Sequence, residues 1–162
     1  MAFIARGKLD TERLARALDA VVERNEVLRW SITTEGGMPQ VVVREEARPR
    51  LQIIDEPGLD LDAAMGRANA MMREPFRLDT PPLMRAALFV IDPESALLAI
   101  VVHHVVFDGT SEQVFADQLG TAYDGESLPP ARLEYEDFAL WRRGYEQGDP
   151  LKRELEFWSE HL

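Results

Sequence analysis

Residues 85–102 read RAALFVIDPESALLAIVV and contain two apolar runs separated by a short polar segment. The separating residues 92–95, Asp-Pro-Glu-Ser, are typical of a turn. The two runs therefore predict a strand, a turn and a second strand. Residues 96–102 are apolar at every position, which is expected of a central strand covered on both faces.

Helical and extended patterns continue on both sides of this hairpin. Asp10 is a good N-cap, and Leu14, Leu18 and Val21 follow at helical spacing, so residues 10–25 are predicted to form a helix. The other predicted elements are a strand at 3–5, a hairpin of 27–34 and 39–44, a strand at 51–54, and helices at 60–73, 110–124, 135–146 and 150–161. The order βαβββαββααα predicts a mixed α/β fold with a mostly antiparallel sheet covered by helices.

Length and composition restrict the class of protein. A chain of 162 residues suits one domain, or two if both are small. Hydrophobic residues make up 46% of the chain, which is expected of a globular protein. The chain has no cysteine, which excludes disulfides, thiolate nucleophiles and cysteine-ligated metal centres.

The net charge and the hydropathy pattern indicate which partners the protein can bind and where in the cell it is expected. The chain has 18 Lys and Arg against 29 Asp and Glu, a formal net charge of −11, so nucleic acid is not expected as a partner. No apolar run approaches the about 20 residues of a membrane span, and the first residues have no signal-peptide pattern. We therefore expect a cytoplasmic protein with no membrane partner.

Residues 101–111 read VVHHVVFDGTS and form the only segment with an evident chemical pattern. His103 and His104 stand at the end of a predicted strand, where alternation directs them to opposite faces. Residues 110–113, Thr-Ser-Glu-Gln, have the form of a capping box that begins the next helix. A neutral imidazole beside a helix N-terminus can accept a proton or hydrogen-bond a nucleophile. Gly109 permits a close backbone approach or a positive φ.

The residues alone leave other interpretations open. A histidine near the end of a strand is often a structural residue with satisfied hydrogen bonds. The His-His-x-x-x-Asp set could ligate a metal, but no third histidine or carboxylate completes it, so no metal site is predicted. Asp-Gly-Thr-Ser is also compatible with an ordinary turn and helix cap.

A resemblance to a known family narrows these interpretations. Residues 102–111 closely resemble the His-His-x-x-x-Asp-Gly core of nonribosomal peptide synthetase condensation domains. Residues 24–29, RNEVLR, resemble the family's Arg-His-Glu-x-Leu-Arg motif, with Asn25 in place of the histidine. Further matching segments are YEDFALW at 135–141, PFRL at 75–78, PLMR at 82–85 and LEFW at 155–158.

The resemblance implies a fold for the complete domain and assigns residues 1–162 to one part of that fold. The family's fold is similar to chloramphenicol acetyltransferase, with two similar lobes in a V and the active site in the tunnel between them. Residues 1–162 would be the N-terminal lobe. The family's initial motif, Ser-x-Ala-Gln-x-Arg-x-Trp, would precede residue 1, and the C-terminal lobe would follow residue 162.

The resemblance also implies an activity. Family members join a carrier-bound acyl or peptidyl thioester to a carrier-bound aminoacyl amine and form an amide. Both substrates are attached to phosphopantetheine on partner carrier proteins, one donor and one acceptor, and the lobe itself binds no cofactor. The other partner would be the C-terminal lobe of the same domain, so the isolated chain is expected to be inactive.

Residue roles follow from matching the motif. His104 would be catalytic, either as a general base or by positioning the amine and the tetrahedral intermediate. Asp108 would be structural, paired with an arginine; Gly109 would keep the tunnel open; and His103 would pack in the opposite layer. The sequence predicts no particular substrate-binding residue.

Several other residues have simpler expected roles. Arg29 is expected to be structural, with a pair to Asp108 as the alternative. Tyr135, Phe138 and Trp141 are expected to pack their helix against the protein, and Met71–Met72 to lie in the core. His161, near the end of the chain, is expected to be exposed.

Three other functions stay open. A non-catalytic half-domain would act as a docking or scaffolding module. An epimerization domain, or an ester-forming acyltransferase relative, would share the histidine motif. The intact histidine pair disfavours the heterocyclization branch of the family, which carries aspartate instead.

Overall fold

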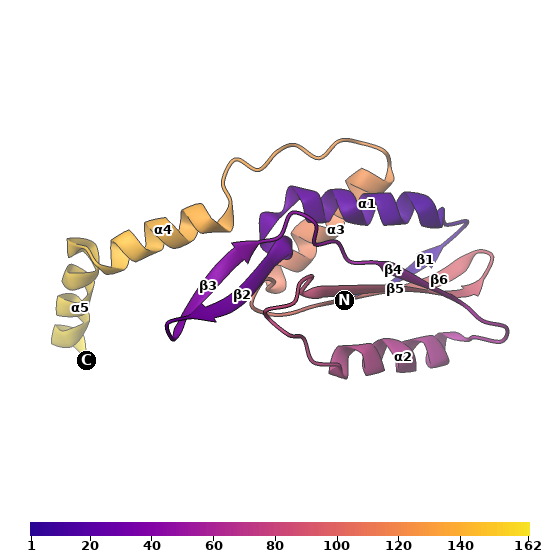
Figure 1. The fold of residues 1–162 in the computed structure, drawn as a ribbon, viewed down its shortest axis with the longest axis horizontal. Helices are drawn as coiled ribbons and strands as arrows, with labels where there is room; N and C mark the ends of the chain where they lie inside the picture. Colours follow the sequence, from indigo (N-terminus) through magenta and orange to yellow (C-terminus); the bar gives the residue numbers. More distant parts are fainter. The chain divides into compact units, whose positions relative to one another are not determined.

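The computed structural model describes all residues from 1 to 162, and the chain forms two compact units, Met1–Pro130 and Ala131–Leu162. The boundary directly follows the sequence Leu128-Pro129-Pro130. The observed order of elements confirms the predicted βαβββαββααα order (Figure 1). The elements of the first unit are β1 (Ala2–Arg6), α1 (Thr11–Arg24), η1 (Glu26–Arg29), β2 (Trp30–Glu35), β3 (Met38–Val43), β4 (Leu51–Asp55), α2 (Leu61–Arg73), β5 (Met84–Asp92), β6 (Ser95–Val102) and α3 (Gly109–Tyr123).

A four-stranded sheet in the order β1-β6-β5-β4 organises the first unit. Strands β5 and β6 form the predicted antiparallel hairpin at its centre, with Leu88 opposite Leu98. Strand β1 adds antiparallel to β6, whereas β4 pairs parallel to β5. A parallel pair needs a long crossover connection, which α2 supplies. The sheet is therefore mostly antiparallel, as predicted, with one parallel pair.

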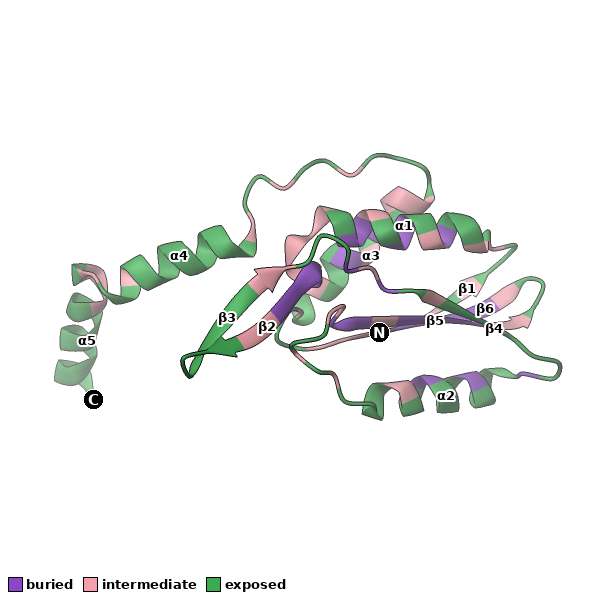
Figure 2. Cartoon of the chain, viewed as in Figure 1, coloured by how far each residue is buried: buried purple, intermediate pink, exposed green.

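Helices cover both faces of this sheet (Figure 1). Met84, Ala86 and Leu88 of β5 belong to the apolar cluster that contains the buried residues of α1 and α3. Ala87 and Phe89 belong to the cluster beneath α2 on the opposite face. Because side chains alternate along a strand, a strand that is apolar at every position suits this three-layer arrangement. Figure 2 shows the buried residues gathered on the central strands and the inner helix faces.

Helix α1 forms as its sequence predicts. The carboxylate of Asp10 accepts a hydrogen bond from the backbone N–H of Arg13 at 2.9 Å, which confirms the predicted N-cap. Leu14, Leu18 and Val21 lie on the buried face of the helix. This face packs against α3 and the sheet, so α1 helps to hold the helix that follows the histidine motif.

The predicted strand at 27–34 begins later than expected. The backbone N–H of Leu28 donates to the carbonyl of Asn25 at 3.1 Å, and residues 26–29 form the 3₁₀ turn η1 before the chain becomes extended at Trp30. Strands β2 and β3 then pair as a separate two-stranded sheet. Gly36 and Gly37 form the turn with φ of 58° and 83°, a conformation that favours glycine.

The second unit contains α4 (Tyr135–Glu146) and α5 (Asp149–His161), which confirm the two predicted helices. Neither helix has a buried residue, and Tyr135, Phe138 and Trp141 are 56%, 45% and 62% exposed (Figure 2). The rings of these residues contact one another along α4, and their packing against the rest of the protein stays a prediction. His161 is exposed, as predicted. No helix in the chain combines the length and hydropathy needed to cross a membrane.

Candidate active site

The two histidines lie in a turn that follows the central strand. Strand β6 ends at Val102, and the backbone N–H of Val106 donates to the carbonyl of His103 at 3.1 Å. Neither histidine belongs to the strand, so alternation along β6 does not set the directions of their side chains. The turn nevertheless gives the two rings different surroundings.

The ring of His103 packs within the protein. It lies 5.9 Å from the ring of Phe76, centroid to centroid, at an interplanar angle of 88°. The backbone N–H of Val105 donates to His103 Nδ1 at 3.1 Å, and the backbone N–H of His103 donates to the carbonyl of Leu83 at 2.9 Å. Because Nδ1 accepts a hydrogen bond, the proton of the neutral ring lies on Nε2. These are the contacts of a residue that holds its turn in place.

The ring of His104 is exposed and makes no hydrogen bond or ion pair within the chain. It lines an open hollow of about 290 Å³, together with residues 100–102 of β6, Phe107, and Asp108 and Gly109 at the start of α3. The structure therefore brings His104, Asp108 and Gly109 to one hollow, with the His104 ring nitrogens available to another molecule. An imidazole in this state can accept a proton or donate and accept hydrogen bonds.

Asp108 is the N-cap of α3, so the predicted capping box at Thr110 is wrong by two residues. The carboxylate of Asp108 accepts hydrogen bonds from the backbone N–H of Ser111 at 2.9 Å and from its hydroxyl at 2.7 Å. The backbone N–H of Asp108 donates to the Ser111 hydroxyl oxygen at 3.2 Å and completes the box. The shift arises because Gly109 and Thr110 already have helical conformation, which makes Ser111 the third helical residue.

These contacts lower the pKa of Asp108. The side-chain hydrogen bond from Ser111 is the largest cause, followed by the backbone N–H of Ser111, and the nearby ring of His104 adds a smaller lowering. Asp108 is therefore a carboxylate at neutral pH, at the positive end of a helix. The resulting arrangement is a fixed negative charge beside an unpaired imidazole.

No ion pair joins Asp108 to an arginine of residues 1–162. Arg29, the alternative partner, is buried and pairs with the carboxylate of Glu45, and its Nη2 donates to the carbonyl of Glu23 at 3.4 Å. The Nε of Arg29 has no partner. Arg29 thus takes the structural role that was expected of it, in the segment that joins α1 to β2.

Gly109 is the first residue of α3 and does not adopt a positive φ. A Cβ atom built at this position would meet no atom within 4 Å, so the expected close backbone approach does not occur within this unit. Because Gly109 lines the hollow, a larger side chain there would extend into open space beside His104 without displacing the fold.

Three residues outside β6 and the motif segment also line the hollow and were not predicted from the sequence: Met1, Met72 and Glu112. Glu112 belongs to the first turn of α3, so its position near His104 follows once the cap is known. Met72 comes from the last turn of α2 and is 62% exposed, so its assignment to the core is wrong, whereas Met71 packs partly against the cluster beneath α2. No local pattern marks Met72, because its position depends on how α2 lies across the sheet.

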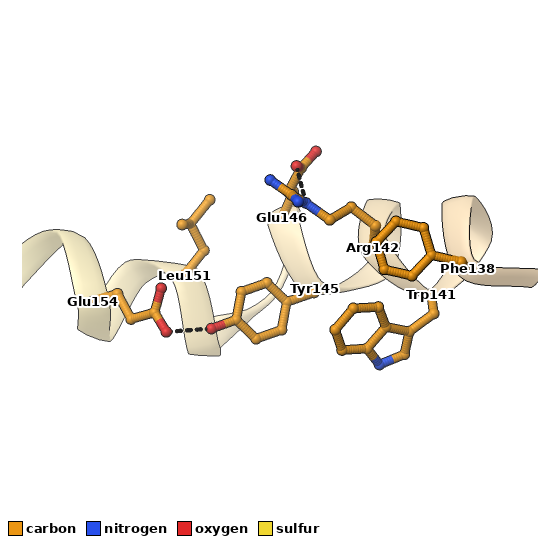
Figure 3. A pocket seen from close by; sticks show the side chains of 7 residues that line it. All are labelled: Phe138, Trp141, Arg142, Tyr145, Glu146, Leu151 and Glu154. Atoms are coloured by element: carbon orange, nitrogen blue, oxygen red, sulfur yellow. Dashed lines mark hydrogen bonds and ion pairs between the residues drawn. The ribbon is translucent and has the colours of Figure 1, made fainter. Parts of the chain in front are cut away.

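The second unit has a hollow of its own, of about 430 Å³, at the bend between α4 and α5 (Figure 3). Phe138, Trp141 and Tyr145 supply its aromatic lining. The Tyr145 hydroxyl donates to the Glu154 carboxylate, and this hydrogen bond raises the pKa of Tyr145. None of the motif histidines lies in this hollow. The chain as a whole contains no cluster of histidines and carboxylates that could hold a metal ion.

Comparison with known proteins identifies the family. The whole chain, residues 1–162, matches the family model described as Condensation domain. Surfactin synthase subunit 2 of Bacillus subtilis (strain 168) is 35% identical over 156 residues, which cover 96% of this chain and 4% of that protein. The chain therefore spans only a small part of the length of this synthetase.

Solved structures agree with this assignment. The SgcC5 protein from Streptomyces globisporus superposes with a TM-score of 0.81 at 28% identity, covering 99% of this chain and 38% of that one. The X-domain from teicoplanin biosynthesis superposes with a TM-score of 0.86 at 25% identity, covering 99% of this chain and 37% of that one. The fold similar to one lobe of chloramphenicol acetyltransferase is thereby confirmed. With its histidine turn, its capped helix and a family match along its full length, this chain belongs to the condensation-domain family.

Proposed function

We propose that residues 1–162 form the N-terminal lobe of a nonribosomal peptide synthetase condensation domain and carry its catalytic histidine, His104. The observation that carries the proposal is the exposed ring of His104, unpaired within the chain, in a hollow beside the N-terminus of α3. The reaction is amide formation between a carrier-bound acyl or peptidyl thioester and a carrier-bound aminoacyl amine.

The chemistry requires one proton to be moved. The acceptor nitrogen attacks the thioester carbonyl and forms a C–N bond, which gives a tetrahedral intermediate. The intermediate then collapses, breaks the C–S bond and releases the donor carrier's thiolate. The amine loses one proton and the thiolate gains one, so the overall reaction is balanced without an external acid, base or oxidant.

His104 fits two roles in this sequence. As a general base it takes the proton from the attacking nitrogen, a contribution of about 10²–10⁴-fold in rate. As a positioning group it hydrogen-bonds the amine or the intermediate and holds it in line with the carbonyl. Asp108 supports either role by fixing the start of α3, and Gly109 leaves room for the substrate beside the ring.

The complete reaction needs partners that this lobe does not supply. A C-terminal lobe of the same domain closes the tunnel, and two carrier proteins deliver the substrates on phosphopantetheine arms. The lobe itself is proposed to bind no cofactor and to be inactive when isolated.

The test uses the complete domain that contains residues 1–162, with donor and acceptor carrier proteins loaded with defined aminoacyl groups. Mass spectrometry of the acceptor carrier follows product formation for wild type, His104→Ala and His161→Ala. His161 is an exposed histidine on α5, outside the hollow, and serves as the matched control. We expect amide product from wild type and His161→Ala, and a loss of at least about 100-fold in His104→Ala.

The same assay separates the related reactions. An acceptor with a hydroxyl in place of the amine tests ester formation, and chiral analysis of the bound aminoacyl group tests epimerization. Product only with the hydroxyl acceptor, or inversion without condensation, would replace amide formation as the reaction. Equal product from wild type and His104→Ala would remove His104 from the active site.

A second candidate function is a docking or scaffolding module without catalysis. It is favoured by the exposed apolar side chains of α4 and α5, among them Trp141, Phe157 and Trp158 at 62%, 51% and 55% exposure. Such an apolar surface is expected at a site that another protein or domain covers. This function predicts that the complete domain forms no amide under any of the conditions above.

A further inference from the structure

We propose that Arg85 and Phe76 are positioning residues that hold the His104 turn in its working geometry. This inference rests on the proposed function, because it concerns the precision with which His104 meets its substrate. We call the three side chains of Arg85, Phe76 and His103, which contact one another in that order, the clamp. None of the three belongs to the hollow that His104 lines.

Arg85 fixes the loop between α2 and β5 at its first two residues. Its Nη1 donates to the carbonyl of Glu74 at 2.9 Å, and its Nη2 donates to the carbonyl of Pro75 at 2.7 Å. Its guanidinium carbon also lies 3.8 Å from the centroid of the Phe76 ring. A planar guanidinium can bind two carbonyls and stack on a ring at once, which an ammonium group cannot do.

Phe76 connects the loop held by Arg85 to the histidine turn. Its ring lies 5.9 Å from the ring of His103, at 88°, the edge-to-face arrangement that aromatic pairs favour. Phe76 also packs partly against the cluster formed by Trp30, Leu83 and Val106. The loop that leaves α2 therefore meets the histidine turn through the Phe76 ring near its start, in addition to the hydrogen bond from the His103 N–H to the Leu83 carbonyl at its end.

His103 connects the clamp to His104. Its Nδ1 accepts the backbone N–H of Val105, and its carbonyl accepts the backbone N–H of Val106, both at 3.1 Å. These two bonds enclose His104, the second residue of the turn. Val106 is buried and anchors the far side of the turn. Because His104 has no side-chain partner of its own within the chain, its position depends on this turn.

A small displacement of the turn would be costly for catalysis. Misplacing a reacting group by about 1 Å can lower a rate by about 100-fold. The clamp therefore acts on the rate of the chemical step and leaves the binding of carrier-bound substrates largely unaffected.

The experiment compares Phe76→Leu, Arg85→Lys and the control Arg77→Gln in the complete domain. Phe76→Leu keeps an apolar side chain but removes the ring pair, and Arg85→Lys keeps the charge but removes the planar stack. Arg77 lies in the same loop, is exposed and pairs only with Asp79, so it tests for general effects of changing an arginine there. We expect kcat to fall by about tenfold in the first two variants, with KM changed by less than about twofold, and no change in the control.

NMR of selectively labelled histidine gives a readout that a purely structural role would not move. In Phe76→Leu the His103 signal shifts through loss of the neighbouring ring alone, so the His104 signal is the test: we expect it to shift, and the signal of His161 to stay in place. Thermal unfolding shows whether each variant is folded. If Phe76→Leu does not fold, the kinetic and NMR measurements on Arg85→Lys test the inference.

The outcomes separate this inference from the proposed function. Normal kcat in Phe76→Leu and Arg85→Lys, with His104→Ala inactive, would overturn the clamp alone. An equal loss in Arg77→Gln would also overturn it, because the loss would then belong to the loop in general. Normal activity in His104→Ala would overturn the proposed function itself.

Discussion

At the scale of single residues, Asp108 connects the fold to the site. Its carboxylate ends the histidine loop and begins α3 by accepting two hydrogen bonds from Ser111. The motif suggested a structural role, and the capping geometry gives that role a physical form. The sequence could not show which residue of Asp-Gly-Thr-Ser begins the helix, because Asp, Thr and Ser are all good N-caps.

The cap predicts a pH-dependent contribution to stability. Because the pKa of Asp108 is lowered in the folded protein, its contribution is present above the ordinary carboxyl pKa and is lost as pH falls through the lowered value. We expect Asp108→Ala to lower the melting temperature of the complete domain at pH 7, with a difference that shrinks in acid. Asp108→Asn, which caps without titrating, is the control and should melt near wild type at pH 7. If the difference in melting temperature between wild type and Asp108→Ala stayed constant as the pH fell through the carboxyl pKa, the capping role of the Asp108 carboxylate would be contradicted.

At the scale of elements, the hydrophobic pattern predicted most of the first unit. Strands β5 and β6 are apolar on both faces and lie at the centre of the sheet, covered by α1 and α3 on one side and α2 on the other. The pattern failed at residues 26–29, where a hydrogen bond to Asn25 keeps the chain in a 3₁₀ turn despite two apolar residues. Local hydrophobicity does not reveal where a backbone bond will delay a strand.

The packing of α1 allows a quantitative test at this scale. Leu18 is 2% exposed and lies in the cluster shared by α1, α3 and the sheet. We expect Leu18→Ala to lower the free energy of unfolding by about 2–5 kcal/mol, because it removes buried methyl groups and leaves a cavity. The neighbouring Asp19 is exposed on the same helix, so Asp19→Ala should change the free energy of unfolding by less than about 0.5 kcal/mol. Denaturant unfolding of the complete domain measures both, and equal values for the two variants would contradict the assigned packing.

At the scale of the whole molecule, two features of the structure have no local signal in the sequence. Contacts between distant segments, such as Phe76 with His103 or Met72 beside the hollow of His104, depend on how elements pack and leave no local pattern. The spacing of the aromatic residues of α4 marks one face of that helix but does not say which surface the face will meet. The family assignment is independent of these features, because it rests on the match of residues 1–162 as a whole.

The central claim is that His104 performs the reaction of a condensation domain. The most direct measurement is the single-turnover rate of amide formation for wild type and His104→Ala, with the complete domain in excess over both loaded carrier proteins. We expect a loss of at least about 100-fold in the variant, with an unchanged melting temperature, because the His104 ring is exposed and makes no hydrogen bond or ion pair within the chain. Equal rates in the two proteins would contradict it.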